Sequence, residues 1–306
     1  MFDLLIIGEI NPDIILRGVD VTPVFGQVEK MVENADLTIG SSSVITACGA
    51  ARLGLKVAFV GVVGDDIYGH FMLKAMQERG IDTSHCIIDP ALQTGFTVIL
   101  AKPDGDRAML TYSGTISVLQ PEQIDRELLR QTSHLHVGSY FLLDGLRAGL
   151  PDLFSLAKAQ NVTTSLDTNW DPREQWQTEG ILPHCDVLLP NDAEAQRLAN
   201  RDTLEESLTV LTEIVPILAV KLGAEGGVVQ QGDEVVKKRP FPVDIVDTVG
   251  AGDSFNSGFL YGFIKQWALT ESLQLALACG SLSTLAAGGT TAQPSLDEAL
   301  EIIDHE

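Results

Sequence analysis

The chain has 306 residues, 45% of them hydrophobic and 20% charged, which is enough to bury one large core and excludes a disordered or collagen-like chain. Its formal net charge of -22 makes binding to nucleic acid or to an anionic membrane surface unfavourable. We therefore expect one domain over 1–306 that binds neither nucleic acid nor membrane. The four cysteines lack the spacing of a zinc site or a redox pair, so we expect a cytoplasmic protein.

Short apolar runs alternate with helical patterns along the chain. The runs are typical of buried parallel strands and lie at 4–8, 57–61, 134–140, 162–167, 186–191 and 217–223. Helical patterns lie at 43–53, 69–79, 149–160 and 192–199, where crossover helices belong. The sequence therefore predicts an α/β fold with a doubly wound, mostly parallel sheet and helices on both faces. Ligands of such sheets bind beyond the carboxyl ends of the strands.

Two segments, 13–40 and 94–114, interrupt this alternation because neither carries a helical pattern. The second alternates around the Pro-Asp-Gly-Asp turn at 103–106, as a hairpin does. We expect both segments to form a small β-lid that covers a site and excludes water. The open edges of such a lid could be covered by a partner subunit, so a lid-mediated homodimer is a further expectation.

The segment 244–263 contains the strongest chemical motif. Gly250, Ala251 and Gly252 form a turn that leads into a helix, and the amide groups of such a helix start can hold phosphate oxygens. Asp253 lies at the same helix start, where the helix dipole is expected to keep it ionised and able to accept a proton. An ordinary Asp cap behind a glycine turn is the alternative interpretation.

The longer string DTVGAGDSF resembles the second signature of the ribokinase/PfkB family of carbohydrate kinases. The resemblance implies a ribokinase-like fold with Asp253 as catalytic base and the amides of Gly250, Ala251 and Gly252 as the anion hole. It also implies a Mg²⁺-dependent kinase that transfers the γ-phosphoryl group of ATP to a hydroxyl of a sugar or sugar acid.

The resemblance extends to the substrate side. In GEINPD it implies that Asn11 and Asp13 bind sugar hydroxyls, although a turn-forming Asn-Pro-Asp is an alternative. The stretch 39–69 resembles the first family signature, with Gly40 on pattern. It departs from that signature at Ser41 and at Ile45, where many members have a second glycine and a sugar-binding Asn. The serines at 41–43 are candidate replacements or helix caps.

One strand end adds a last substrate candidate. Tyr140 follows the apolar run that contains His134 and His136, at a position where some family members present a substrate-contacting side chain. The two histidines lack a third ligand, so we interpret them as strand residues and not as a metal site.

On the nucleotide side, PNDAEA matches the family's N-x-x-E motif. The match implies that Asn191 orients phosphate and that Glu194 holds Mg²⁺ through water, although both also fit a helix cap and its first turn. The resemblance also places Lys221, Gly223 and Gly226 beside ATP. Asp247 and Ser295 resemble the monovalent-cation site of some members, which makes K⁺ a candidate cofactor; a capping Asp and a surface Ser explain them equally well.

The acceptor stays open at this stage, because the sequence names neither the sugar nor its hydroxyl nor the oligomeric state. Nucleosides and 2-keto-3-deoxygluconate are alternatives. Related sugar-acid kinases often have Arg where this chain has Asp171, and Arg173 is a candidate substitute. A catalytically silent nucleotide or sugar sensor is the alternative from another class, and retention of the Asp253, Asn191 and Glu194 motifs argues against it. A Rossmann dehydrogenase is disfavoured, since one glycine follows the first strand.

Overall fold

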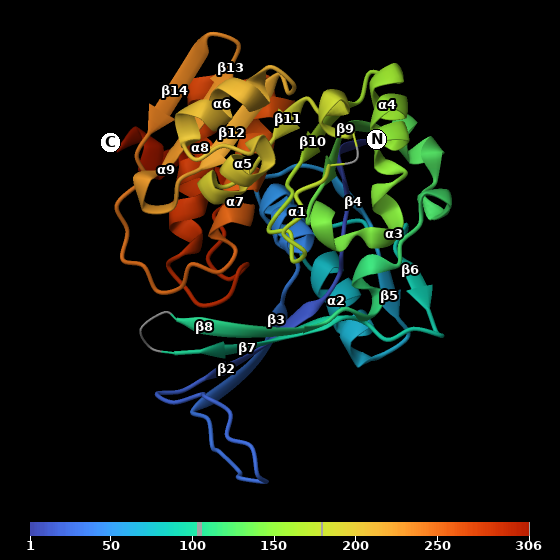
Figure 1. Cartoon of the computed structure of the whole chain (residues 1–306), viewed down its shortest axis with the longest axis vertical. Coiled ribbons are helices and arrows are strands. Elements are labelled where there is room, and N and C mark those ends of the chain that lie inside the picture. The colour runs from blue at the N-terminus through green and yellow to red at the C-terminus, as the bar shows by residue number, and fades with distance from the viewer. Residues whose placement is uncertain (103–105, 179, 306) are drawn as a thin grey trace.

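The computed structural model describes residues 1–102, 106–178 and 180–305 (Figure 1). Its main sheet has the strand order β14-β13-β12-β11-β10-β9-β1-β4. Strands β12 to β4 in this order are parallel, and β13 and β14 add an antiparallel edge. The strands are β1 (Phe2–Ile7), β4 (Val57–Val60), β9 (Thr132–Val137), β10 (Thr163–Leu166), β11 (Val187–Leu188), β12 (Ile217–Lys221), β13 (Gly227–Gln231) and β14 (Glu234–Lys238).

Helices cover both faces of this sheet. One face carries α1 (Ser42–Arg52), α2 (Ile67–Gln77), α7 (Ala251–Ile264) and α8 (Leu269–Ser283), with α9 (Leu296–Asp304) against α8; the other carries α3 (Asp144–Arg147), α4 (Leu150–Ala159), α5 (Asp192–Ala199) and α6 (Leu204–Thr212). Strand β1 shows why both faces need cover. Leu5 and Ile7 enter one core and Leu4 and Ile6 the other, and all four are fully buried.

A second sheet, called here the small sheet, has the order β3-β2-β7-β8. Its strands are β2 (Pro12–Arg17), β3 (Asn34–Ile39), β7 (Phe96–Ala101) and β8 (Arg107–Tyr112). The two segments that lack helical patterns thus pair with each other, through parallel strands β2 and β7. Figure 1 shows the small sheet projecting from the body beyond α1 and α2. The predicted turn at 103–106 falls largely on residues outside the described ranges.

The predicted fold class is confirmed, and the predicted strands and helices agree with the observed ones to within a few residues. A further pair of short strands, β5 (Val62–Gly64) and β6 (Ile87–Asp89), lies outside both sheets. Among the described residues, each helix is too short or too polar to cross a membrane.

Candidate active site

Helix α7 begins at a glycine whose backbone conformation and close contacts exclude a side chain. Gly250 is the N-cap residue with a φ of 74°, and a Cβ atom there would lie 2.6 Å from Cα of Gly289. No side chain caps α7, and within the described residues the amides of Gly252 and Asp253 have no acceptor. An anion can therefore bind these amides at the positive end of the helix dipole.

Asp253 is half-buried beside these amides, and Oδ1 accepts a hydrogen bond from the Ser42 hydroxyl. Burial raises the pKa of Asp253 to about 7; the nearby carboxylates of Asp167 and Glu9 act in the same direction, while Ser42 and Lys221 oppose them. Burial thus opposes the predicted effect of the helix dipole, which was to keep this carboxyl ionised. A pKa near the operating pH suits a general base.

Lys221 lies at the carboxyl end of β12 in a buried polar network. Its Nζ lies 2.7 Å from Oδ2 of Asp167 and 3.2 Å from Oδ1 of Asn256, whose Nδ2 also donates to Asp167. Burial lowers the pKa of Lys221, but Asp167 and Glu194 outweigh it and the net direction is upward. Lys221 is therefore a charged group, and its side chain lies next to Gly252.

Asn191 and Glu194 close the start of α5 with a reciprocal capping box. The amide of Asn191 donates to Oε2 of Glu194 over 2.8 Å, and the amide of Glu194 donates to Oδ1 of Asn191 over 2.8 Å. Burial, with help from Asp167, raises the pKa of Glu194 to about 7 against the effect of Lys221. Oxygen Oε1 of Glu194 is outside the capping box and can face a hydrated cation.

The glycine turn after β12 is fixed by backbone geometry. Gly223 and Gly226 have φ angles of 54° and 92°, and a Cβ atom at Gly226 would lie 2.1 Å from the carbonyl oxygen of Lys238. An isolated bridge between Asn191 and Lys221 ties this strand end to the start of α5. The residues predicted to bind nucleotide therefore meet at one edge of the main sheet.

The predicted sugar-binding residues meet where β1 passes into the small sheet. Asn11 and Asp13 are 5% and 8% exposed. A Cβ atom at Gly40 would lie 2.3 Å from Oδ1 of Asp13, so glycine leaves the space that this carboxyl occupies. Thr97 pairs with Asp13 across the strands and with Thr111 on its other side, which forms a polar row. Burial raises the pKa of Asp13 to about 7, although Arg107 opposes it.

The serines at the start of α1 have separate partners. The hydroxyl of Ser41 donates to the backbone oxygen of Glu9 over 2.6 Å and accepts from the amide of Val44 over 3.1 Å, so Ser41 is a helix cap. This geometry counts against the prediction that its hydroxyl binds substrate. Ser42 faces Asp253, and Ser43 donates to Oε2 of Glu9 over 2.6 Å.

Ile45, the departure from the first family signature, faces the glycines behind the anion-binding turn. It is 3% exposed. A Cβ atom at Gly250 would lie 3.1 Å from Cγ2 of Ile45, and one at Gly289 would lie 2.6 Å from its Cδ1. The side chain therefore packs against the start of α7 and adds no polar group for a substrate.

The prediction that Tyr140 contacts substrate is wrong. Its side chain is fully buried and packs edge-on against Phe141, with the guanidinium of Arg147 5.8 Å from the ring centroid. Ser139 explains the error, because its left-handed φ of 51° turns the chain at the end of β9 and directs the next residue into the core. His134 and His136 are likewise buried, bonded to Ser165, and no metal-binding cluster of His, Cys, Asp and Glu occurs among the described residues.

Asp247 and Ser295 are both engaged with the protein. Asp247 accepts hydrogen bonds from the amides of Val249 and Gly288, each over 3.0 Å. Ser295 is the N-cap of α9 and accepts from the amide of Glu298 over 3.3 Å. These contacts account for both side chains without a bound cation. The monovalent-cation site stays a prediction.

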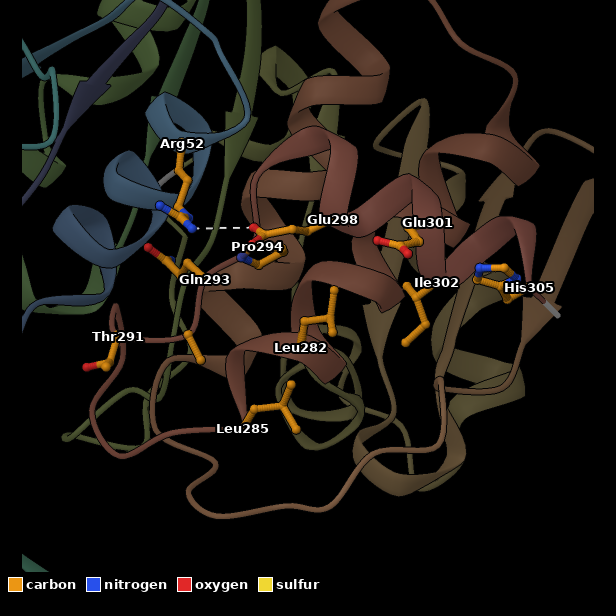
Figure 2. Close-up of a pocket in the computed structure, with 11 residues that line it drawn as sticks. Arg52, Leu282, Leu285, Thr291, Gln293, Pro294, Glu298, Glu301, Ile302 and His305 are labelled. Atoms are coloured by element: carbon orange, nitrogen blue, oxygen red, sulfur yellow. Dashed lines mark hydrogen bonds and ion pairs between the residues drawn. The ribbon is translucent and has the colours of Figure 1, made fainter.

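A pocket of about 570 Å³ lies behind this region, between the end of α1 and helices α8 and α9. Figure 2 shows Arg52 reaching Glu298 across its rim, with Leu282 and Ile302 on its floor. The predicted site residues are not part of its lining. Gln293 of its lining donates to the hydroxyl oxygen of Ser254 over 3.1 Å, so the pocket adjoins the start of α7 without including Asp253.

Sequence reasoning missed two members of the site. Glu9, directly after β1, is 3% exposed and bonds to Ser41, Ser43 and Ser139. Asn256 lies one helical turn after Asp253, is fully buried, and donates a hydrogen bond to the carboxylate of Asp167. The available signal for Glu9 was a carboxylate at the carboxyl end of an apolar strand, where ligands of such sheets bind.

The fold is that of a phosphotransferase, and its site places the Asp253 carboxyl beside helix amides that have no acceptor among the described residues. A family model for pfkB family carbohydrate kinases matches residues 1–296. The chain therefore belongs to the pfkB family of carbohydrate kinases, as the signatures predicted, and the dehydrogenase alternative is wrong.

Individual relatives agree with this assignment. An uncharacterized sugar kinase of Archaeoglobus fulgidus is 30% identical over 246 residues, which are 78% of this chain and 92% of the relative. Arabidopsis thaliana ribokinase, solved with ribose and ATP, covers 99% of this chain and 98% of its own with a TM-score of 0.84 and 21% identity. An Escherichia coli protein solved with ATP and Mg²⁺ covers 100% of both chains with a TM-score of 0.87 and 21% identity. These two structures support the fold.

Proposed function

We propose that this chain transfers the γ-phosphoryl group of ATP to a hydroxyl of a sugar or sugar acid, with Asp253 as the base. The carrying observation is Asp253 itself: a half-buried carboxyl with a pKa of about 7 in the first turn of an uncapped helix. A base and a set of phosphate-binding amides are the two elements that phosphoryl transfer from ATP to an alcohol requires.

The proposed step conserves atoms and charge. Asp13 and Asn11 hold the acceptor through its other hydroxyls, and Asp253 accepts the proton of the attacking hydroxyl. A bond forms between that oxygen and the γ-phosphorus while the bond to the leaving ADP oxygen breaks. The amides of Gly252 and Asp253 stabilise the negative charge on the transferring group. The predicted anion hole also included Gly250 and Ala251, but the amide of Ala251 donates to the backbone oxygen of Thr248 over 3.3 Å, which counts against its part in it.

The nucleotide contacts are proposed for the other side of the site. Asn191, Lys221, Gly223 and Gly226 lie at one sheet edge and would contact ATP. Mg²⁺, when bound, neutralises phosphate oxygens, and Glu194 would hold it through water with the oxygen that its capping box leaves over. K⁺ is left out of the reaction, because Asp247 and Ser295 already have protein partners. A comparison of rates in K⁺ and in Na⁺ salts tests that omission.

A neutral sugar is the preferred acceptor. Asp171, at the position where related sugar-acid kinases carry Arg, is 2% exposed and accepts hydrogen bonds from the amides of Arg173, Gln175 and Trp176. The side chain of Arg173 donates to Asp144 over 2.6 Å, so it does not substitute for the missing Arg. Nucleosides and 2-keto-3-deoxygluconate remain the alternatives for an acceptor screen.

The small sheet is proposed to act as a lid. It carries Asp13 of the sugar site, and Arg17 near its far end lies 3.9 Å from Asp247, in the loop before α7. The lid would exclude water that otherwise hydrolyses ATP. A variant with Arg17→Ala is expected to raise ADP release without acceptor, and an unchanged rate would contradict the lid.

The outer face of the lid supports a homodimer. Leu37, Ile14, Val98 and Leu110 form one apolar row across all four strands, and Leu37 and Leu110 are 46% and 63% exposed. A second copy would cover this row. Sedimentation should show a dimer that Leu110→Glu dissociates. We also propose a cytoplasmic location, which fits ATP as substrate and four free cysteines.

The test of the function is an ADP-release screen with Mg-ATP across neutral sugars, sugar acids and nucleosides. We expect turnover with a neutral sugar and its loss in Asp253→Asn. Binding of ATP and sugar without any ADP release would support the catalytically silent sensor instead.

A further inference from the structure

Ser42 provides the one side-chain hydrogen bond that the described residues make to the carboxylate of Asp253. Its hydroxyl donates to Oδ1, and no described residue donates to Oδ2, which is left for an acceptor hydroxyl. We propose that Ser42 is a positioning residue for the base, which orients the Asp253 carboxylate and stabilises its ionised form. The inference rests on the proposed function, since it assigns a role relative to that base.

Ser42 is held in place because a single buried carboxylate fixes the residues on both sides of it. The hydroxyl of Ser41 lies 3.0 Å from Oε1 of Glu9, and the hydroxyl of Ser43 lies 2.6 Å from Oε2. The amide of Ser43 also donates to Oε1 over 3.3 Å. The three bonds leave Ser42 between two anchored neighbours.

Backbone strain shows how closely this arrangement is determined. Ser41 and Ser139 have φ angles of 67° and 51°, which side-chain-bearing residues rarely adopt. Ser41 donates to the backbone oxygen of Glu9, and Ser139 donates to its carboxylate. Gly8 leaves room for the cluster, since a Cβ atom there would lie 2.1 Å from Oγ of Ser43. Such strain persists where the surrounding bonds compensate for it, as at functional sites.

The remaining charges around Asp253 come from other elements. Glu9 after β1 and Asp167 after β10 disfavour its ionised form, and Lys221 at the end of β12 favours it. Lys221 is already bonded to Asp167 and Asn256. The hydroxyl of Ser42 is therefore the neutral contact of Asp253, and its removal changes no charge in the site.

The test compares the pH dependence of kcat/KM for the acceptor that the screen yields. Ser42→Ala removes a donor to the ionised carboxylate, so the pKa of Asp253 rises and a smaller fraction of the base is ionised at pH 7. We expect kcat/KM to fall by about tenfold at pH 7, with the loss shrinking at high pH. The rising limb should move to higher pH. The KM for ATP should stay unchanged, and Ser42→Thr should restore the profile.

Thr46→Val is the matched control. Thr46 lies one turn further along the same face of α1, and its hydroxyl contacts the backbone oxygen of Asp253 over 3.4 Å, away from the carboxylate. The rising limb of the pH profile of kcat/KM should therefore lie at the same pH in Thr46→Val as in wild type. The inference would be overturned if Ser42→Ala also left the rising limb at the wild-type pH, or if kcat/KM fell by the same factor at every pH. The proposed function fails separately, if Asp253→Asn keeps turnover.

Discussion

Two helix starts at the same edge of the sheet are built in opposite ways. Helix α5 is closed by its own side chains, with Asn191 and Glu194 each satisfying the other's amide. Helix α7 begins at a left-handed Gly250 with no side-chain cap. The amides at the start of α7 stay available for the proposed phosphate contact, whereas the first amides of α5 are satisfied by the protein itself. Helix α4 also lacks a side-chain cap, so the open start of α7 is distinguished by the half-buried carboxyl of Asp253 in its first turn.

The largest expected effect comes from Asp253→Asn at the open helix start. The amide is nearly isosteric but cannot accept the hydroxyl proton, so kcat should fall by roughly 10²- to 10⁴-fold. The KM for ATP should change little, because the neighbouring amides remain. Initial-rate kinetics measure both. Near-normal kcat with a lower unfolding temperature would instead make Asp253 an ordinary cap.

The same variant has a pH-dependent effect on stability. Because burial raises the pKa of Asp253 to about 7 in the folded chain, the folded state binds its proton more tightly than the unfolded chain does. Ionisation therefore destabilises the fold as the pH rises from about 4 to above 7. Asp253→Asn should raise the unfolding temperature at pH 8 and have little effect at pH 4, as thermal denaturation can show. A stabilisation that is equal at both pH values would contradict the assigned pKa.

Asp13→Ala should affect one substrate only. Removing hydrogen bonds to a charged carboxylate should raise the acceptor KM by about 10- to 100-fold, while the KM for ATP stays near its normal value. Equal changes in both constants would indicate a folding defect and remove Asp13 from the sugar site.

Gly250→Ala tests whether the open helix start depends on the backbone. The left-handed φ and the contact with Gly289 should cost about 1–3 kcal/mol of folding free energy, and kcat should fall because the amides move. Chemical denaturation and steady-state rates are the measurements. An alanine variant with normal stability would show that the turn does not require glycine.

The smallest effect is expected at the closed helix start. Asn191→Ala should lower stability by about 1 kcal/mol, and Thr203→Ala, which removes the cap of α6, should do the same. Only Asn191→Ala should also raise the KM for ATP if Asn191 contacts phosphate. Identical kinetics for the two variants would assign Asn191 to capping alone.

The fold was predictable because local patterns determine it. Apolar runs as in β1, buried on both faces, and helical patterns between them specify a mostly parallel sheet. The two small-sheet segments were recognisable by the lack of a helical pattern. Their pairing through β2 and β7 was not, since strands so far apart in sequence carry no local signal of register.

The site was predictable where one motif contains its own chemistry, as around Asp253. The site was not predictable where the residues that contact each other are far apart in the sequence. Glu9 bonds to Ser41 and Ser139, 32 and 130 residues away, and no local pattern reveals these contacts. Tyr140 was misassigned because one left-handed residue at a strand end decides whether the next side chain faces the site or the core. Ile45 stands where many family members have a sugar-binding Asn, and the sequence alone did not show that its side chain packs against Gly289.

The most direct measurement of the central claim is the pH dependence of kcat/KM for the acceptor in wild type and in Asp253→Asn, which reports the pKa values of the free enzyme. If Asp253 is the base, wild type shows a rising limb near its pKa of about 7, and the variant is slow with that limb absent. Asp13 and Glu194 also have pKa values of about 7 and are present in both proteins, so a limb that survives in the variant belongs to them. That result would contradict the account.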